Sequence, residues 1–251
     1  MFYRCTSSFI LNEEAGIKVI RVEDVTVELG GLVVLRDIYL NLEPGLHVVL
    51  GRNGSGKSTL LKTMAGLVKP VKGRVLVRGI NVHSLPRREA VKLIGYTWQN
   101  PYAGFVEATV KDELEFTKRI AGVDLQRDII DQLIPQYLLD RNPFTLSGGE
   151  AKRVSIAMIL AIDQPIWLLD EPFDYLDSSG VEVVVKLITR GVERGKVVVI
   201  ASANTAYLHL LKPHSVIILS KGVVTFEGDP EDLSPSVLEE HGVPSRQLMC
   251  G

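Results

Sequence analysis

The stretch GRNGSGKST, residues 51–59, decides the fold. It follows the apolar run LHVVL at residues 46–50 and precedes LLKTMAGL at residues 60–67, which has helical character. Glycines let backbone N–H groups turn inward, and a helix N-terminus adds the positive end of its dipole. A loop of this kind between a strand and a helix therefore forms a cradle for anions. In this context the pattern G-x-x-x-x-G-K-[ST] predicts a phosphate-binding loop.

The predicted loop would hold the phosphates and the metal ion of a nucleoside triphosphate. In this motif Lys57 should reach the β- and γ-phosphates, and the hydroxyl of Ser58 should ligate Mg²⁺. The alternative is a glycine-rich surface turn that ends in Lys-Ser, but it does not explain the strand and the helix on either side. The predicted nucleotide-binding residues of the loop are Gly51, Arg52, Asn53, Gly54, Ser55, Gly56, Lys57, Ser58 and Thr59.

A second motif, IWLLDEP at residues 166–172, ends an apolar run in two carboxylates. At the end of a buried strand Asp170 can hold Mg²⁺ through water. Glu171 follows at the carboxyl edge of the sheet, where open α/β sheets bind their ligands, and it is placed to polarise an attacking water molecule. If this motif stood alone, an acidic strand end that only solvates a loop would be the better interpretation. Together with the phosphate loop, the pair predicts the second half of a hydrolytic site.

The motif LSGGE, residues 146–150, combines a helix cap with two glycines. Ser147 and Glu150 have the spacing of a capping box. Gly148 and Gly149 each weaken a first helical turn by about 1 kcal/mol relative to alanine. A helix start without a ligand explains the serine and the glutamate but not the paired glycines. Paired glycines are expected where bare backbone N–H groups approach an anion.

Other apolar runs predict an α/β fold around these motifs. IWLLD, VVVIA at residues 197–201 and SVIIL at residues 215–219 are nearly continuous, as in parallel strands covered on both faces. Residues 58–67 and 180–194 have helical character between such runs, which indicates right-handed βαβ units and a doubly wound core.

The flanks and the middle of the chain have different patterns. Residues 18–44 alternate between apolar and polar residues, as do the glycine-bounded segments GRVLVRG and GVVTFEG at residues 73–79 and 222–228. This alternation predicts antiparallel strands. Residues from about 101 to 161 have helical periodicity and little strand character. They predict a helical subdomain inserted into the core.

Composition excludes several classes of protein. The 251 residues are 46% apolar and 23% charged, and the net charge of −2 comes without a basic stripe or tail, so no nucleic-acid partner is expected. Only Cys5 and Cys250 are cysteines, which favours a reducing compartment over a disulfide framework. No apolar run could span a bilayer, and Asn12, Glu13 and Glu14 stand where a signal peptide would be cleaved. The protein is expected in the cytoplasm, at a membrane only through a partner.

Five motifs together resemble the ATP-binding-cassette family. GRNGSGKST, the Gln99 of YTWQNP, LSGGE, LLDEP and the YLD that contains Asp177 follow the order and spacing of that family, from about residue 18 to about residue 233. The resemblance implies an α/β fold with a P-loop NTPase core of mostly parallel sheet, an antiparallel β subdomain and an inserted helical subdomain. It implies an extension at residues 1–17 and one ATPase domain at 18–251. The nucleotide-binding core would comprise 18–98 and 162–251, and the helical subdomain about 99–161.

The resemblance also implies a head-to-tail dimer with two ATP molecules at the interface. One subunit would hold each nucleotide through its phosphate loop, Gln99, Asp170 and Glu171, with Gln99 also touching Mg²⁺. The other subunit would supply Ser147, Gly148 and Gly149 to the γ-phosphate and place Asp177 near the interface. The glycine pair would then be exposed because its ligand is bound by another chain, which is either a copy of this chain or a sister subunit.

The segment from Gln99 onward is similar to one group of importers. Trp98-Gln99-Asn100-Pro101 and EATVKDELEF at residues 107–116 resemble the ATPases of energy-coupling-factor importers for cobalt, nickel and vitamins. This implies an integral membrane transport protein as partner, docked on the helical subdomain. An amphipathic helix capped by Thr109 is the simpler explanation of EATVKDELEF. A non-transport ATPase in cofactor assembly or regulation is the alternative function.

Two positions depart from the family pattern. The aromatic residue that usually stacks on adenine falls on Leu29, in VTVELGG. After VVVIA the family usually has Thr-His-Asp, whereas this chain has Ser202-Ala203-Asn204, so the histidine that contacts the γ-phosphate falls on Ala203. His209 lies six residues further on, in an expected helix, and is expected to be a surface or packing residue. The departures predict weaker adenine contact and slow hydrolysis.

Overall fold

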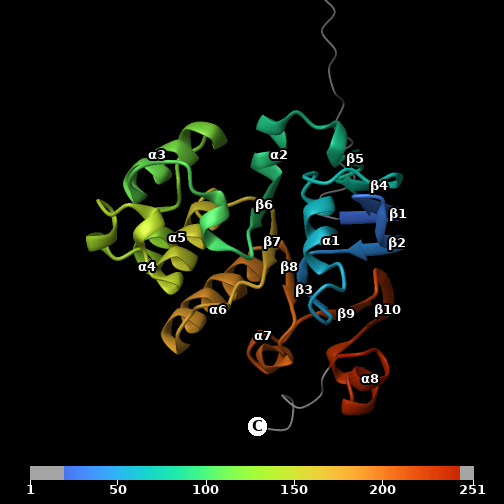
Figure 1. Cartoon of the computed structure of the whole chain (residues 1–251). Helices are drawn as coiled ribbons and strands as arrows, with labels where there is room; N and C mark the ends of the chain where they lie inside the picture. The colour runs from blue at the N-terminus through green and yellow to red at the C-terminus, as the bar shows by residue number, and fades with distance from the viewer. Residues whose placement is uncertain (1–19, 244–251) are drawn as a thin grey trace, which may run out of the picture.

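A six-stranded sheet forms the centre of the molecule in the computed structural model, which describes residues 20–243 (Figure 1). Its strand order is β10-β9-β3-β8-β7-β6. The strands from β9 to β6 run parallel, and β10 pairs antiparallel with β9 at one edge. The strands are β3 (Gly45–Leu50), β6 (Ile94–Thr97), β7 (Ile166–Asp170), β8 (Val197–Ser202), β9 (Ser215–Ser220) and β10 (Val223–Gly228).

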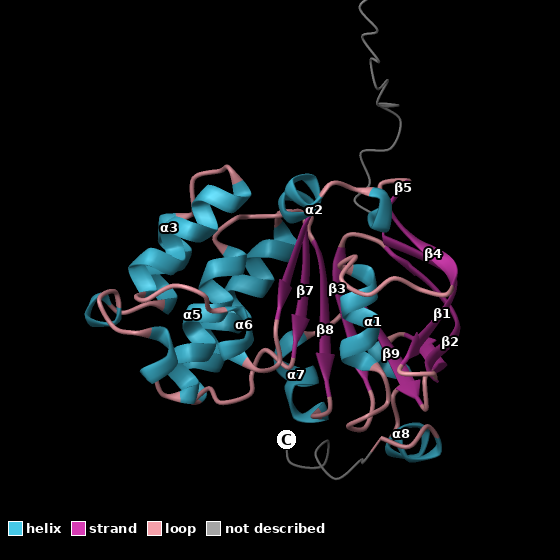
Figure 2. Ribbon diagram, turned by 45° about the horizontal axis from the view of Figure 1, so that its top comes forward, coloured by secondary structure: helices cyan, strands magenta, loops and turns pink. Residues whose placement is uncertain are grey.

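A second, four-stranded sheet lies beside the first (Figure 2). Its order is β2-β1-β4-β5, and every pair in it is antiparallel. This confirms the antiparallel pairing predicted from the alternating residues, because β1 turns directly into β2 and β4 pairs back onto β1. The strands are β1 (Ile20–Leu29), β2 (Leu32–Leu42), β4 (Lys72–Val77) and β5 (Ile80–Asn81).

Helices cover both faces of the central sheet. Helix α1 packs between the two sheets, where Leu60, Leu61 and Met64 share one apolar cluster with β1 and β2. Helices α5 and α6 cover the opposite face with a second cluster. The α-helices are α1 (Lys57–Met64), α2 (Arg87–Leu93), α3 (Val110–Ala121), α4 (Arg127–Leu133), α5 (Gly148–Leu160), α6 (Ser178–Glu193), α7 (Leu208–Leu211) and α8 (Pro235–Glu240).

Burial on both faces explains why the core strands read as continuous apolar runs. In β3 all six residues are buried, with Val48 and Leu50 in the cluster under α5 and α6 and Val49 in the cluster under α1. Strands β7 and β8 are buried along their whole length as well. The predicted α/β fold with a mostly parallel sheet is therefore confirmed. Strand β6 was not among the predicted strands, because IGYT is a short run between a helix and a loop.

The segment between β6 and β7 contains only helices and turns among the described residues. Helices α3, α4 and α5 lie together on one side of the central sheet (Figures 1 and 2). Helix α3 begins at the predicted cap, since Thr109 Oγ1 accepts a hydrogen bond from Asp112 N at 3.1 Å. The division into core and helical subdomain stays a prediction. No helix within residues 20–243 is long and apolar enough to cross a membrane.

Several predictions fall on residues that the structure does not describe. The extension at residues 1–17, the acidic stretch at 12–14, Cys5 and Cys250 lie outside residues 20–243. Within that range no cluster of three or more His, Cys, Asp or Glu side chains could hold a metal ion.

Candidate functional site

The loop after β3 has the backbone that a phosphate cradle requires. Gly54 and Gly56 have φ angles of +79° and +107°, which side-chain-bearing residues rarely adopt. Gly51 also has no room for a side chain, because an added Cβ would lie 2.3 Å from Leu219 O. Helix α1 then begins at Lys57 without a side-chain cap. Its first N–H groups are therefore left to a ligand or to solvent.

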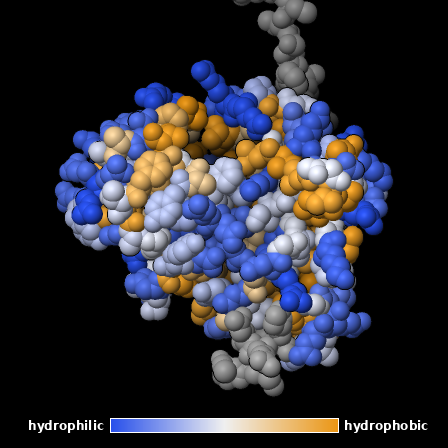
Figure 3. Space-filling view, viewed as in Figure 1, coloured by the Kyte–Doolittle hydropathy of each residue, from blue (hydrophilic) through white to orange (hydrophobic). Residues whose placement is uncertain are grey.

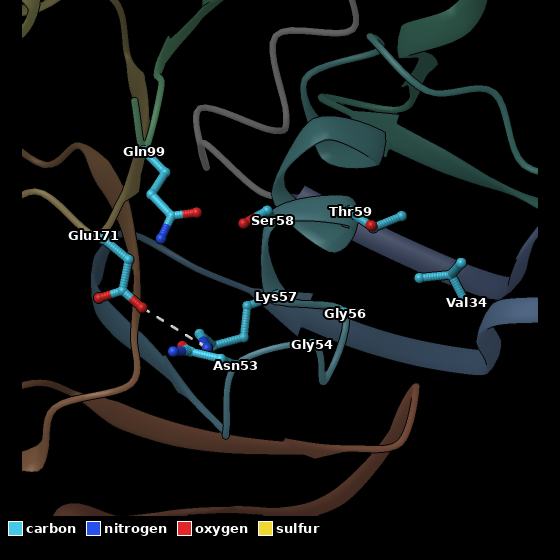
Figure 4. A pocket seen from close by; sticks show the side chains of 9 residues that line it. All are labelled: Val34, Asn53, Gly54, Gly56, Lys57, Ser58, Thr59, Gln99 and Glu171. Atoms are coloured by element: carbon cyan, nitrogen blue, oxygen red, sulfur yellow. Dashed lines mark ion pairs between the residues drawn. The ribbon is translucent and has the colours of Figure 1, made fainter. Parts of the chain in front are cut away.

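An open cavity of about 230 Å³ lies in front of this loop (Figure 4). The loop, the segment after β6 and the end of β7 all contribute to it, so motifs far apart in sequence meet at the carboxyl edge of the sheet. Gly51, Arg52 and Ser55 belong to the loop but do not line the cavity, and Ser55 Oγ is buried without a hydrogen-bond partner. The lining residues are Val34, Asn53, Gly54, Gly56, Lys57, Ser58, Thr59, Gln99 and Glu171.

Two opposite charges face each other at the bottom of the cavity. Lys57 Nζ lies 3.7 Å from Glu171 Oε1 and donates hydrogen bonds to Gly51 O at 2.8 Å and Arg52 O at 3.2 Å. Burial lowers the pKa of Lys57, and the carboxylates of Glu171 and Asp170 partly oppose this. Burial likewise raises the pKa of Glu171, against the effect of Lys57. The pair is a cation and a base held side by side out of water.

Glu171 is held in place by the next strand of the sheet. Its Oε1 accepts a hydrogen bond from Ala203 N at 2.8 Å, and its own N–H donates to Ala201 O at 2.9 Å. The backbone of Glu171 has a φ of 44°, in the left-handed region. This turn at the end of β7 points the side chain toward the phosphate loop, as Figure 4 shows.

Asp170 is buried behind Ser58. Ser58 Oγ donates to Asp170 Oδ1 at 3.1 Å, and Tyr96 Oη donates to Asp170 Oδ2 at 3.0 Å. Burial and the Asp170 carboxylate raise the pKa of Tyr96, so the phenol stays protonated and can donate. Tyr96 was not predicted from sequence, because IGYT gives no sign that its tyrosine meets the aspartate 74 residues later. The two bonds fix the orientation of the carboxylate.

The oxygens around Ser58 suit a hard cation. In Figure 4 the side chain of Gln99 points from the end of β6 toward Ser58. The Ser58 hydroxyl, the Asp170 carboxylate and the Gln99 amide oxygen are donors of the kind that Mg²⁺ binds, usually with water completing its shell. This mixed donor set is compatible with the predicted metal site.

The LSGGE segment lies at a separate cavity of about 460 Å³. The capping box is present: Glu150 N donates to Ser147 Oγ at 3.4 Å, and Ser147 N donates to Glu150 Oε2 at 2.9 Å. Ser147, Gly149 and Asp177 line this cavity, which shares no lining residue with the first. The LSGGE segment and the phosphate loop are therefore not brought together within one chain.

The glycine pair also has a packing role within the chain. A Cβ added to Gly148 would lie 2.9 Å from Tyr175 Cδ1, and one added to Gly149 would lie 3.0 Å from Tyr175 O. Tyr175 itself has a φ of 68° and is exposed at the surface of the second cavity. Close contact with Tyr175, with its side chain at Gly148 and its carbonyl oxygen at Gly149, thus gives a second physical reason for both glycines.

Asp177 has a local structural role. It caps α6 by accepting a hydrogen bond from Gly180 N at 2.8 Å, and it pairs with Arg153 Nη2 at 2.9 Å. The bond from Gly180 N–H, with help from Arg153, lowers the pKa of Asp177. Because Arg153 belongs to α5, this pair ties the LSGGE helix to the start of α6.

The two positions that depart from the family pattern, Leu29 and Ala203, lie in different surroundings. Leu29 at the end of β1 is half-exposed and does not line the phosphate-loop cavity, whereas Val34 on β2 does. Ala203 offers its backbone N–H to Glu171, and no histidine of residues 20–243 lines the cavity. His209 is exposed on α7 and is not a lining residue, in agreement with its expected surface role.

Comparison with known proteins agrees with this geometry. Residues 35–174 match the ABC transporter family. A Pyrococcus furiosus protein named as an ABC transporter ATP-binding protein is 40% identical over 207 residues, 79% of this chain and 78% of the relative. The energy-coupling factor transporter ATP-binding protein of Mycoplasma mobile is 36% identical over 206 residues, 79% of this chain and 75% of the relative.

A solved structure shows the same architecture. An ATP-binding cassette dimer in a post-hydrolysis state, bound to ADP and Pi, superposes with a TM-score of 0.72 at 25% identity, covering 84% of this chain and 98% of that one. The family match spans more than half of the chain, and its range includes the phosphate loop, the LSGGE segment and the Asp-Glu pair. The chain therefore belongs to the ABC transporter family, as an ATP-binding subunit.

Proposed function

We propose that this chain binds and hydrolyses ATP to power a membrane importer, through closure of a dimer around two nucleotides. The observation that carries the proposal is the convergence of Lys57, Ser58, Gln99 and Glu171 on one cavity, with Asp170 directly behind Ser58. A cation, oxygen ligands and a buried carboxylate base at the carboxyl edge of a parallel sheet are what phosphoryl transfer to water requires.

The loop and Lys57 hold the phosphates of ATP. The uncapped start of α1 offers N–H donors, and the Lys57 ammonium can turn from the carbonyls of Gly51 and Arg52 to phosphate oxygens. Ser58, Gln99 and Asp170 would hold Mg²⁺, with Tyr96 keeping the carboxylate in position. Bound with ATP, the metal ion would neutralise charge that develops on the phosphates. This assignment gives a role to Lys57, Ser58 and Gln99 among the polar residues that line the cavity.

Glu171 orients and deprotonates the attacking water. Its raised pKa brings a carboxylate closer to the pH at which it acts as a base, and Ala203 N–H fixes its orientation. The negative phosphates of a bound nucleotide would compete with Glu171 for Lys57. The carboxylate would then be free to accept a proton from water.

The second cavity completes the site of another subunit. Ser147, Gly148 and Gly149 form the start of α5 and lie apart from the phosphate loop of their own chain. They contribute to catalysis only if the γ-phosphate belongs to a nucleotide bound by a partner, which is a copy of this chain or a sister ABC ATPase. The dimeric cassette with ADP and Pi supports this arrangement.

Two observations support an importer: an apolar cavity at the surface of this chain and the name of one relative. Beside the segment that carries Gln99 lies an apolar cavity of about 210 Å³ between α2 and α5, with Trp98 and Ile94 in its lining. In Figure 3 apolar residues surround a hollow between α2 and the group of helices α3, α4 and α5. A short helix of an integral membrane protein would fit there and hold the chain at the cytoplasmic face. The energy-coupling factor name of the Mycoplasma mobile relative supports an importer of that group.

Purification from membranes tests the importer assignment. The tagged chain is isolated from detergent-solubilised membranes and its ATP hydrolysis is measured. We expect an integral membrane protein to co-purify and to change the hydrolysis rate. Hydrolysis without any integral membrane partner would instead support the alternative, a regulatory or cofactor-assembly ATPase.

Restoring a histidine at position 203 should accelerate hydrolysis. Ala203→His places an imidazole N–H donor beside Glu171, where one γ-phosphate contact is missing, and we expect a rise on the order of tenfold. Phosphate release at saturating ATP measures the effect. Ala203→Leu is the size control without a donor and should not accelerate the reaction. Equal rates for Ala203→His and the parent chain would show that the missing histidine is irrelevant here.

Adding an aromatic ring beside the cavity should strengthen ATP binding. Among residues 20–243 no aromatic residue lines the phosphate-loop cavity, and Val34 is the lining residue on β2. A ring at Val34→Tyr can stack on adenine, so we expect affinity to rise about 2- to 10-fold, and by more than in Leu29→Tyr. Leu32→Tyr, on the same strand but away from the cavity, is the control. Titration calorimetry with ATP decides, and a larger gain for Leu29→Tyr would place adenine at the end of β1 instead.

A further inference from the structure

Lys152 is a fully buried lysine in the helix that begins with the LSGGE motif. Lys152 is 0% exposed, as are Ala151 and Val154 on the same helix. The ammonium donates hydrogen bonds to Trp98 O at 3.2 Å, to Gln99 O at 3.3 Å and to Asp170 O at 3.3 Å. Its three hydrogen-bond partners in the described chain are therefore main-chain carbonyls from two different segments.

Burying this ammonium is costly, so its position needs an explanation. Desolvation lowers the pKa of Lys152 to about 8, opposed by the carboxylates of Asp174, Asp170 and Glu171. An apolar side chain of similar length, such as methionine, would fill the same space without that cost. What methionine cannot do is donate to the three carbonyls. The ammonium is thus better explained by its donors than by its volume.

The carbonyls that Lys152 holds belong to groups of the proposed ATP site. Gln99 and Asp170 are the proposed Mg²⁺ ligands, and Trp98 precedes Gln99 along the segment that lines the apolar cavity. Lys152 follows Ser147 by about one and a half helical turns on α5. Helix α5 therefore has two tasks. At its start it presents the LSGGE motif to a partner's nucleotide, and further along Lys152 binds the backbone of this chain's own proposed metal ligands.

We propose that Lys152 is a positioning residue that fixes the backbone of Gln99 and Asp170 relative to α5, so that docking of Ser147–Gly149 on one nucleotide aligns the metal ligands of the other. The proposal rests on the proposed function, because only a dimer with two nucleotides gives α5 both tasks. Lys152 itself touches neither nucleotide.

Two substitutions separate a donor from a space-filling side chain. Lys152→Met keeps length and volume but removes the donors, whereas Lys152→Gln is shorter but keeps an amide N–H donor. If the donors matter, Met lowers kcat at least tenfold and Gln remains closer to the parent chain. If Lys152 only fills space, the order reverses, with Met active and Gln impaired. Thermal unfolding of both variants is measured alongside, and Lys186→Met, an exposed lysine on α6, is the surface control.

Binding with and without Mg²⁺ provides a second readout. Calorimetric titration with ATP in EDTA should give affinities within twofold for the parent chain and Lys152→Met, because the phosphate loop is untouched. With Mg²⁺ present, the parent chain should gain affinity and Lys152→Met should gain much less. An unchanged kcat, or the same gain with Mg²⁺ in Lys152→Met as in the parent chain, overturns the proposal. A parent chain that hydrolyses no ATP, alone or with its membrane partner, instead overturns the proposed function.

Discussion

Replacing Glu171 with glutamine is expected to lower the rate of ATP hydrolysis roughly 100- to 10,000-fold, the range observed for loss of a general base. The amide keeps the size of the side chain and can still accept the hydrogen bond from Ala203 N. It cannot take a proton from water. ATP binding should be retained, because the phosphate loop and Lys57 are unchanged. Phosphate release under single-turnover conditions measures the loss.

The pH dependence of hydrolysis gives the same residue a second test. Glu171 must be ionised to act as a base, and burial raises its pKa. The rate should therefore fall as the pH is lowered through this raised pKa, and Glu171→Gln should lack that step. Glu182→Gln, an exposed carboxylate on α6, is the matched control and should behave like the parent chain. A Glu171→Gln rate within threefold of the parent rate would assign the base to another group.

Replacing Lys57 with methionine should have the second-largest effect, on ATP binding. The ammonium is buried beside Glu171 and is the only lysine among the cavity-lining residues of the described chain. Losing its charge-assisted hydrogen bonds to phosphate should weaken ATP binding roughly 10- to 100-fold. Titration calorimetry measures the loss, with exposed Lys69→Met as the control. Unchanged affinity in Lys57→Met would mean that the nucleotide does not bind at this cavity.

The sequence predicted best those parts of the site in which local chemistry determines local structure. Residues adjacent in sequence were enough to predict three features: the glycines of the phosphate loop, the capping box of Ser147 and Glu150, and the apolar strand before Asp170. The continuous apolar runs of the core gave the parallel sheet, since strands buried on both faces have no reason to alternate.

Contacts between distant segments could not be predicted in this way. Tyr96 meets Asp170 only because β6 and β7 are adjacent in the sheet, and Lys152 reaches Gln99 only through the packing of α5. Val34 lines the cavity because β2 folds over the start of α1. No local motif assigned a role to any of these residues. Their roles depend on the tertiary arrangement, which a short sequence pattern does not contain.

The LSGGE segment shows where a sequence argument and a structure give different reasons for the same residues. Paired glycines predicted a backbone that approaches an anion. The structure shows that Gly148 and Gly149 also lie against Tyr175, so packing alone could require them. The two explanations differ in what they expect of a dimer, because packing against Tyr175 needs no second chain.

The mass of the Glu171→Gln protein in solution tests the central claim most directly. With ATP and Mg²⁺ present, light scattering should show two subunits with two bound ATP molecules, and with ADP it should show single subunits. The same experiment with Ser147→Arg added should leave ATP bound but keep the subunits apart. Protein that binds ATP yet stays a single chain, both alone and mixed with any ABC ATPase co-purified from the same membranes, would contradict the proposed closure of a dimer around ATP.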